Sequence, residues 1–293
     1  MHVRRASDLF LTFFAWLSSI GTLLAVLILL GFLFKRGLGA LDLQLFFGDT
    51  PWLEAVSGAK PVFEGIWPAL AGSFLLVLLS SVIAIPLGVA SGIYLAEFGS
   101  RRLQAVLGFA VDMLAGTPSI VMGLFGFTMI LFLRKILFPH ARTCLVLSGL
   151  CVALLVLPYV IRTTQTVLLA IPGHMRMLGP SLGLSPWQNI RHVLLPLSAR
   201  GILAGAILAI GRASEDTAVI LLTGAVARAG VPGSLLDKFE ALPFRIYYLA
   251  AEHRSSSELN QGFGAALVLL LMTGVLFAAA FILQRSIEKR WKR

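Results

Sequence analysis

Long apolar runs with almost no charge constrain this chain more than any other feature of its sequence. Residues 9–34, 65–96, 145–161 and 259–284 contain no Asp, Glu, Lys or Arg, and the runs 103–133 and 201–226 contain one and three. A membrane-spanning helix needs about 20 such residues, because bare charges and unpaired backbone groups are costly in hydrocarbon. The first run is too long for a cleaved signal and lacks a small-residue cleavage site. We therefore predict an all-α membrane protein, a helical bundle with about six transmembrane helices.

The composition supports the same class. Of the 293 residues, 58% are hydrophobic and only 13% are charged, whereas a soluble domain is about 45–50% apolar and about 25% charged. The net charge of +10 is not gathered on a polar domain, so it does not indicate a nucleic-acid partner. Cations instead mark cytoplasmic segments of membrane proteins. Arg4, Arg5 and the basic tail at 286–293 predict that both ends are cytoplasmic, although Arg134 and Lys135 then lie on an outer turn.

The runs divide the chain into an N-terminal part and a core. We predict a transmembrane helix and an extracytoplasmic loop in residues 1–64, a membrane core in residues 65–285, and a cytoplasmic loop at about 162–200 within that core. Prolines and glycines break this loop into short helices and turns. Apolar residues recur in it at helical spacing from Trp187 to Leu194. Two interpretations stay open: a helix that lies on the inner leaflet, or a docking surface for a cytoplasmic partner.

The loop and four further motifs resemble a known family. Gly183, Trp187, Ile190, Leu195 and Pro196 have the spacing of the second half of the "EAA" loop of bacterial ABC-importer permeases. The chain is also similar to phosphate-importer permeases of the PstA type at residues 65–73, 85–88 with 93–97, 117–126, and 212–218 (Arg-Ala-Ser-Glu-Asp-Thr-Ala). The motifs occur in order and at family spacing over residues 65–283.

The resemblance implies a fold, a function and partners. It implies the ABC type I importer permease fold and import of inorganic phosphate across the cytoplasmic membrane. The partners implied are a second, homologous permease subunit, two cytoplasmic ATPase subunits and an extracytoplasmic phosphate-binding protein, besides membrane lipid. Residues Gly183 to Pro196 would couple the permease to the ATPase. Another small anion, such as molybdate or tungstate, and an ATP-independent channel or secondary transporter are the alternatives.

The chain departs from the family pattern in two places. The family's Glu-Ala-Ala falls on Met177, Leu178 and Gly179, so the glutamate of the coupling loop is missing. Pro180 follows, and proline costs about 3 kcal/mol in a helix interior, so we expect the coupling helix to begin at Ser181 or to be distorted. In the other departure, Glu215 and Asp216 replace the family's Gly-Glu.

Three charged residues in the fifth run are the candidate substrate pathway. Arg212 precedes Glu215 by three residues and Asp216 by four, so all three can share one helix face. Charges within a span usually face a bundle interior or a water path, and an arginine offers a planar fork of donors to an oxyanion. The alternative is a buried ion pair that fixes packing between two permease subunits.

A second candidate for the pathway lies in the third run. Thr117 and Ser119 flank Pro118, which leaves a carbonyl unpaired, so we expect a kink whose hydroxyls line a gate. Asp112 is either an acid near the membrane interface or the partner of a basic residue. The spaced glycine pairs 88/92 and 201/205 predict close helix packing.

Several kinds of site are not indicated by the sequence. No lysine follows a glycine, which excludes a Walker A loop, so ATP hydrolysis would require a separate subunit. The histidines lack metal-ligand spacing, and no hydrolase or metalloprotease motif occurs. We therefore predict no catalytic residue, no cofactor and no metal site, and a membrane enzyme is disfavoured.

Overall fold

The protein is a bundle of helices. The computed structural model describes residues 2–58, 60–136 and 139–291, with side chains in 10–58, 60–136 and 139–286. Within these ranges the only β-structure is an isolated bridge between Ala225 and Phe239. Six helical segments are long and apolar enough to cross a membrane, which confirms the predicted class and number: Phe10–Ala40, Trp67–Phe98, Ser119–Ile136, Leu145–Leu169, Pro186–Glu215 and Ser256–Ser286.

The bundle is built around α7 (Leu145–Leu169), between α4 (Trp67–Ile93) and α11 (Leu195–Glu215). Glycines allow both close approaches, as their spacing predicts. A Cβ atom added at Gly88 of α4 would lie 2.6 Å from that of Val160, and one added at Gly205 of α11 would lie 2.7 Å from that of Thr163. Backbones packed this closely require small residues at the contact.

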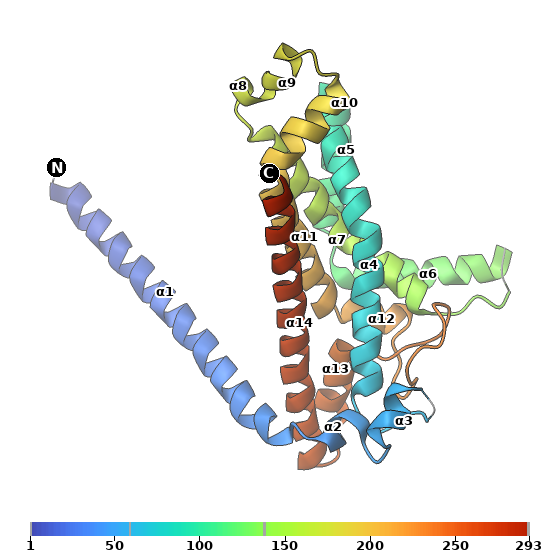
Figure 1. The fold of residues 1–293 in the computed structure, drawn as a ribbon. Coiled ribbons are helices and arrows are strands. Elements are labelled where there is room, and N and C mark those ends of the chain that lie inside the picture. Colours follow the sequence, from blue (N-terminus) through green and yellow to red (C-terminus); the bar gives the residue numbers. More distant parts are fainter. Residues whose placement is uncertain (1, 59, 137–138, 292–293) are drawn as a thin grey trace.

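Two long helices lie outside this centre. α14 (Ser256–Trp291) packs on α11 and on α13 (Leu242–Glu252), whereas α1 (His2–Gly37) meets α14 near its own C-terminal end and then diverges from the bundle (Figure 1). The rings of Phe32 and Phe263 are 5.5 Å apart at this contact. The start of α1 and the end of α14 point toward the same end of the bundle (Figure 1), as an even number of spans requires.

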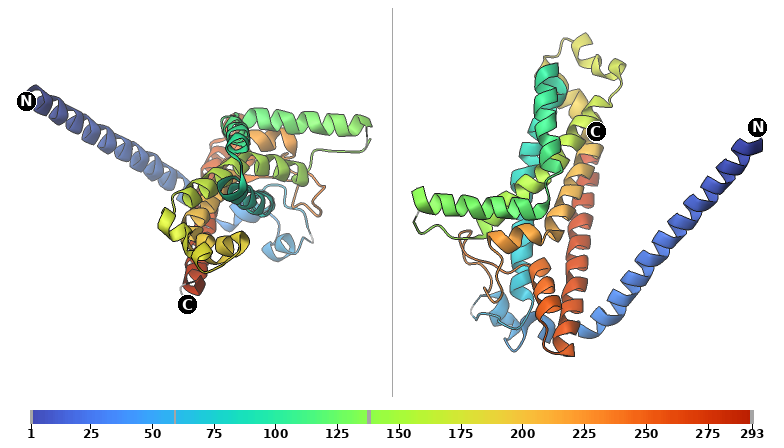
Figure 2. Two further views of the ribbon diagram at one scale, coloured as in Figure 1. Left: turned by 90° about the horizontal axis from the view of Figure 1, so that it is seen from above. Right: turned by 180° about the vertical axis from the view of Figure 1, so that it is seen from behind.

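The third apolar run is two helices rather than one kinked span. α5 (Arg101–Ala115) ends before Gly116. α6 (Ser119–Ile136) then runs crosswise to α4, α7 and α14 and extends away from the bundle (Figures 1 and 2). Pro118 cannot continue α5, because it has no N–H to donate. The direction of α6 is then set by packing on α12 (Ala218–Thr223). The expected kink at Pro118 is therefore a full break.

The fifth run also differs from its predicted span. Helix begins well before residue 201, because α10 (Pro186–Asn189), the π-helical turn η3 (Ile190–Leu194) and α11 follow one another without a gap. At the other end α11 stops at Glu215, and Asp216 and Thr217 separate it from α12. Residues 186–194, expected to form a separate amphipathic helix, thus lead directly into a span.

The two ends of the bundle carry different structures. One end, which we call the loop end, carries α8 (Gly173–Arg176), α9 (Leu178–Ser181) and α10 (Figure 1). The opposite end carries η1 (Leu38–Ala40), α2 (Leu43–Phe47), α3 (Trp52–Val56) and the start of α14. The loop before α13 packs tightly there, since a Cβ atom added at Gly72 of α4 would lie 2.0 Å from the Glu240 carbonyl oxygen.

The Glu240 carboxyl is buried in that loop. Its Oε1 accepts a hydrogen bond from the Gly230 N–H at 3.3 Å, and both Arg228 and Gly230 have positive φ, 60° and 77°. Burial raises the pKa of this carboxyl above its ordinary value of 4.5, while Arg245 and the N–H groups of residues 228–230 oppose the rise. The native state therefore binds this proton more tightly than the unfolded state does.

That difference predicts a pH-dependent stability. Because the folded pKa is raised, Glu240 adds stability below its ordinary pKa of 4.5, and this contribution is lost as the pH rises through the folded value. In detergent, the unfolding temperature of the wild type relative to Glu240→Gln is expected to fall as the pH rises from 4.5. Glu252→Gln, which changes an exposed acid of α13, is the control. A constant difference between the wild type and Glu240→Gln would contradict the assignment.

Candidate transport pathway and coupling loop

The predicted pathway charges lie where α11 ends. Asp216 caps α12, because its Oδ1 accepts a hydrogen bond from the Val219 N–H at 2.8 Å. Its Oδ2 lies 3.3 Å from Nη2 of Arg212, and the side chains are 1% and 37% exposed. The buried acid therefore holds an arginine that stays partly accessible. Such an arginine keeps donors available for an anion.

Glu215 does not join this pair. Its side chain is exposed, and within the described residues no ion pair links it to Arg212. Spacing of three and four residues allowed both acids to share the arginine's face, but the helix ends at Glu215. The turn that follows directs only Asp216 toward Arg212. Of the predicted cluster, the structure thus brings together two members.

Thr117 and Ser119 lie at the break between α5 and α6. The Thr117 hydroxyl donates to the Met113 carbonyl at 2.9 Å, which satisfies a backbone group at the end of α5. Ser119 is the first residue of α6. The same helix packs on α12, where a Cβ atom added at Gly123 would lie 2.9 Å from the Ala218 carbonyl oxygen. Thr117 and Ser119 thus lie at the start of the helix that packs on α12. Their role in a gate stays a prediction.

A second charge pair, whose side chains are partly exposed, joins α5 to α7 and was not assigned from the sequence. Arg162 Nε donates to Asp112 Oδ1 at 2.8 Å, and Nη2 lies 2.5 Å from Oδ2. Nη2 also donates to the Gly108 carbonyl at 2.6 Å, and Nη1 to Gln165 Oε1 at 2.9 Å. Of the two roles open for Asp112, the structure selects that of a partner for a basic residue.

The predicted coupling residues occupy the loop end. Gly183 has a φ of 74°, in the left-handed region that glycine adopts without strain. α10 then begins at Pro186 behind a capping box, in which Ser185 and Gln188 bond each other's backbone. The coupling helix therefore does not begin at Ser181. Pro180 lies in the separate helix α9.

The coupling residues divide between a core and an exposed surface. Ile190 is buried, Leu195 and Pro196 are half-buried, and Trp187 is 60% exposed. Trp187 borders an apolar groove of about 490 Å³ along the end of α4, lined also by Pro86, Val89, Ala90, Ile93, Tyr94 and Phe98. Other apolar side chains exposed at the loop end are Met177, Leu178 and Leu182. Trp187 and these three side chains form the exposed apolar part of the predicted coupling loop.

Comparison with known proteins identifies relatives of this chain. Residues 84–293 match the family model described as "Binding-protein-dependent transport system inner membrane component". The phosphate transport system permease protein PstA of Haemophilus influenzae is 34% identical over 82% of this chain and 80% of its own length. The protein of the same name from Mycobacterium leprae is 31% identical over 78% and 75%.

Solved structures share the fold at low identity. A bacterial ABC transporter involved in import of the acidic polysaccharide alginate superposes with a TM-score of 0.64, at 14% identity, over 93% of this chain and 96% of that one. The MetNI methionine ABC transporter in an inward-facing conformation gives 0.54, at 20% identity, over 83% and 100%.

The six spans, the broken helices and the exposed loop between α7 and α11 define a multi-pass permease, a transport subunit of an inner membrane. The chain belongs to the family of binding-protein-dependent transport system inner membrane components.

Proposed function

We propose that this chain is the permease subunit of an ATP-driven importer that moves inorganic phosphate across the cytoplasmic membrane. The main support for phosphate as the cargo is the similarity of this chain to phosphate transport permeases. One of them is 34% identical over most of the chain. The pair of Arg212 with buried Asp216 supports it, because an arginine held by one acid still presents donors to a phosphate oxygen.

The complex would contain a second, homologous permease, two ATPase subunits and an extracytoplasmic phosphate-binding protein. The loop end and both chain termini face the cytoplasm in this proposal, so that Trp187 meets the ATPase. ATP binding and hydrolysis move the coupling loop, and this movement opens the pathway alternately to each side. This chain supplies half of the pathway and half of the ATPase-docking surface.

Uptake by phosphate-starved cells tests the function. Deleting the gene is expected to reduce accumulation of labelled phosphate, and a plasmid copy is expected to restore it, because this chain supplies half of the proposed pathway. Molybdate and tungstate uptake are measured in the same cells as controls. Unchanged phosphate uptake with reduced uptake of either other anion would contradict the proposed cargo. Uptake that persists after the ATPase is removed would indicate a channel or secondary transporter.

A further inference from the structure

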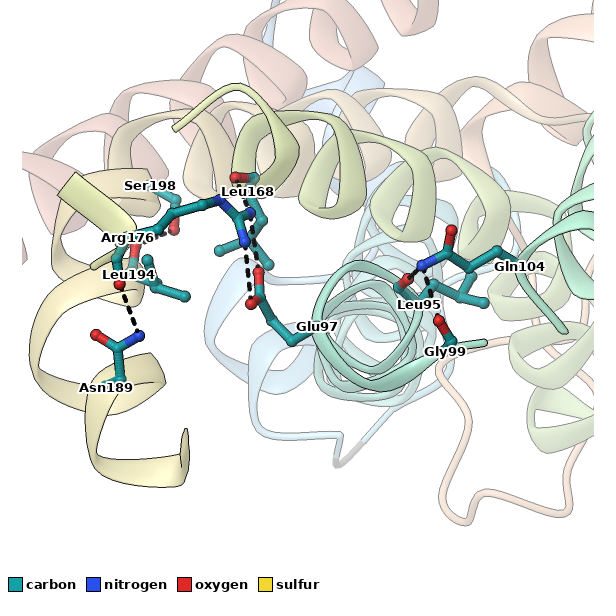
Figure 3. Close-up of polar contacts among 9 residues, drawn as sticks. All are labelled: Leu95, Glu97, Gly99, Gln104, Leu168, Arg176, Asn189, Leu194 and Ser198. Atoms are coloured by element: carbon teal, nitrogen blue, oxygen red, sulfur yellow. Dashed lines mark hydrogen bonds and ion pairs between the residues drawn. The ribbon is translucent and has the colours of Figure 1, made fainter. Parts of the chain in front are cut away.

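Arg176 connects the coupling loop to the membrane helices. Its Nη1 donates to Glu97 Oε2 at 3.1 Å, and its Nη2 lies 3.0 Å from Glu97 Oε1 and donates to the Leu168 carbonyl at 2.6 Å (Figure 3). The Arg176 carbonyl accepts a hydrogen bond from Asn189 Nδ2 at 3.2 Å. One residue of α8 thus contacts the end of α4, the end of α7 and the coupling helix α10.

Glu97 belongs to a turn that is itself held by α5. The turn, η2 (Tyr94–Phe98), is a π-helical continuation of α4. Gln104 of α5 donates through Nε2 to the Leu95 carbonyl at 2.8 Å and to the Gly99 carbonyl at 3.0 Å (Figure 3). A π turn leaves its carbonyls in irregular positions and often occurs at functional sites. Here the side chain of Gln104 bonds the Leu95 carbonyl within the turn and the Gly99 carbonyl just after it, and so ties the turn that carries Glu97 to α5.

The loop has no acid of its own to pair with Arg176. No Asp or Glu occurs between Asp112 and Glu215, an interval that contains the whole loop. The glutamate that the family pattern places at position 177 is methionine here. Since Glu97 and Arg176 have side chains only 14% and 26% exposed, each charge is partly withdrawn from water and depends on the other. The carboxylate that neutralises the loop arginine comes from the end of α4.

Apolar packing alone leaves the position of the loop less defined. A hydrophobic cluster behind the ion pair contains Ile93, Ala96, Leu168, Ile190 and Leu194. Hydrophobic contact is non-directional, so it holds the loop against the helices without fixing how the two are oriented. A two-pronged arginine–carboxylate contact adds that geometric definition. Without the ion pair the cluster would remain, and the loop would be attached but less well oriented.

We propose that Glu97 and Arg176 form a link that makes the coupling loop move as one body with the ends of α4 and α5. Both are positioning residues: they act through the loop and do not contact the cargo. The link rests on the proposed function, because it carries motion from an ATPase at the loop end to the transport pathway.

The test uses the complete transporter in proteoliposomes and measures phosphate accumulated per ATP hydrolysed. Glu97→Gln keeps the size of the side chain and removes its charge, so the complex is expected to assemble and hydrolyse ATP. The ratio is expected to fall by roughly 2- to 30-fold, the range found for residues that couple distant sites. A merely structural role would lower transport and hydrolysis together and leave the ratio unchanged, which would overturn the link.

A double-mutant cycle assigns the effect to the pair. If Glu97 and Arg176 act together, Glu97→Gln with Arg176→Gln lowers the ratio no further than the more harmful single change. Additive effects would overturn the link, and so would failure of both single variants to assemble. The matched control is Glu54→Gln, which breaks the exposed ion pair with Lys60 at the opposite end and is expected to leave the ratio unchanged.

A second measurement does not depend on the cargo. Spin labels at two exposed positions, His174 in the loop and Val106 on α5, report whether these parts move together when the assembled complex binds ATP. The label distance is expected to stay constant in the otherwise unmodified complex and to change in Glu97→Gln. A distance that changes without the substitution, or that stays constant with it, would overturn the link. Lack of phosphate accumulation by a wild-type complex that hydrolyses ATP would reject only the proposed cargo.

Discussion

Replacing Arg212 by alanine is expected to abolish most phosphate uptake while the transporter still assembles. The substitution removes the donors that Asp216 holds near the end of α11, and it leaves the buried Asp216 charge without its partner at 3.3 Å. A hydrogen bond to a charged group contributes about 1.5–3 kcal/mol, so losing the donors to the anion should lower uptake at least about tenfold. The measurements are initial uptake rate in cells and recovery of the complex after detergent extraction.

A double variant separates transport from packing. Arg212→Ala combined with Asp216→Asn removes both charges, and the asparagine oxygen can still cap α12. If Arg212 contacts the anion, the double variant stays inactive although it is electrically neutral. Restored uptake in the double variant would show that Arg212 serves only to neutralise Asp216. Arg254→Ala, which changes an exposed arginine at the opposite end of the bundle, is the control and should transport normally.

Replacing Trp187 by glutamate is expected to release the ATPase from the membrane complex. Trp187 is 60% exposed and is the largest side chain on the coupling helix α10. An aromatic residue at the centre of an interface contributes about 2 kcal/mol or more, so the affinity should fall at least about thirtyfold. Co-purification of the ATPase with the tagged permease measures this loss. Trp52→Glu makes the same change at an exposed tryptophan of α3 and should retain the ATPase.

The backbone conformation of Gly183 leads to a related prediction about ATPase binding. Its φ of 74° costs about 1–2 kcal/mol for an ordinary L-residue, whereas asparagine tolerates it better. No atom of the described residues lies within 4 Å of an added Cβ, so backbone conformation and not crowding decides the outcome. Gly183→Val should therefore weaken ATPase binding and Gly183→Asn should largely preserve it. If both variants retained the ATPase equally well, the turn at Gly183 would have no part in docking.

The sequence predicted the spans better than their ends. Charge-free runs identify helices that cross a membrane, since burial of apolar surface and loss of charge act over the whole segment. The ends of those helices depend on single residues within uniformly apolar sequence. Hydropathy is similar on both sides of Pro118, so the change of direction between α5 and α6 was read as a kink. The contact of Gly123 with α12, which orients α6, joins segments distant in the sequence.

Contacts between charged residues were likewise predictable only where the residues lie close together in the sequence. Arg212, Glu215 and Asp216 were predicted to share one helix face, because they lie three and four residues apart. The structure pairs Arg212 with Asp216 at 3.3 Å, whereas Glu215 is exposed, because α11 ends at Glu215. Arg162 and Asp112 are 50 residues apart, and Arg176 and Glu97 are 79 apart. No local spacing relates such residues. The available signal was that an acid and an arginine each interrupt largely apolar sequence, which indicates a need for a partner without identifying it.

The π turns η2 and η3 accommodate an extra residue without turning the helices on either side of them. A π turn contains one residue more than an α turn, so η3 takes up within Ile190–Leu194 a residue that would rotate a regular helix by about 100°. Deleting one residue from Ile190–Leu194 would restore a regular helix and leave Trp187 close to its present face. Inserting one residue into the regular helix α11 next to η3 would instead turn α10 and Trp187 by about 100°, although no contact residue had been altered.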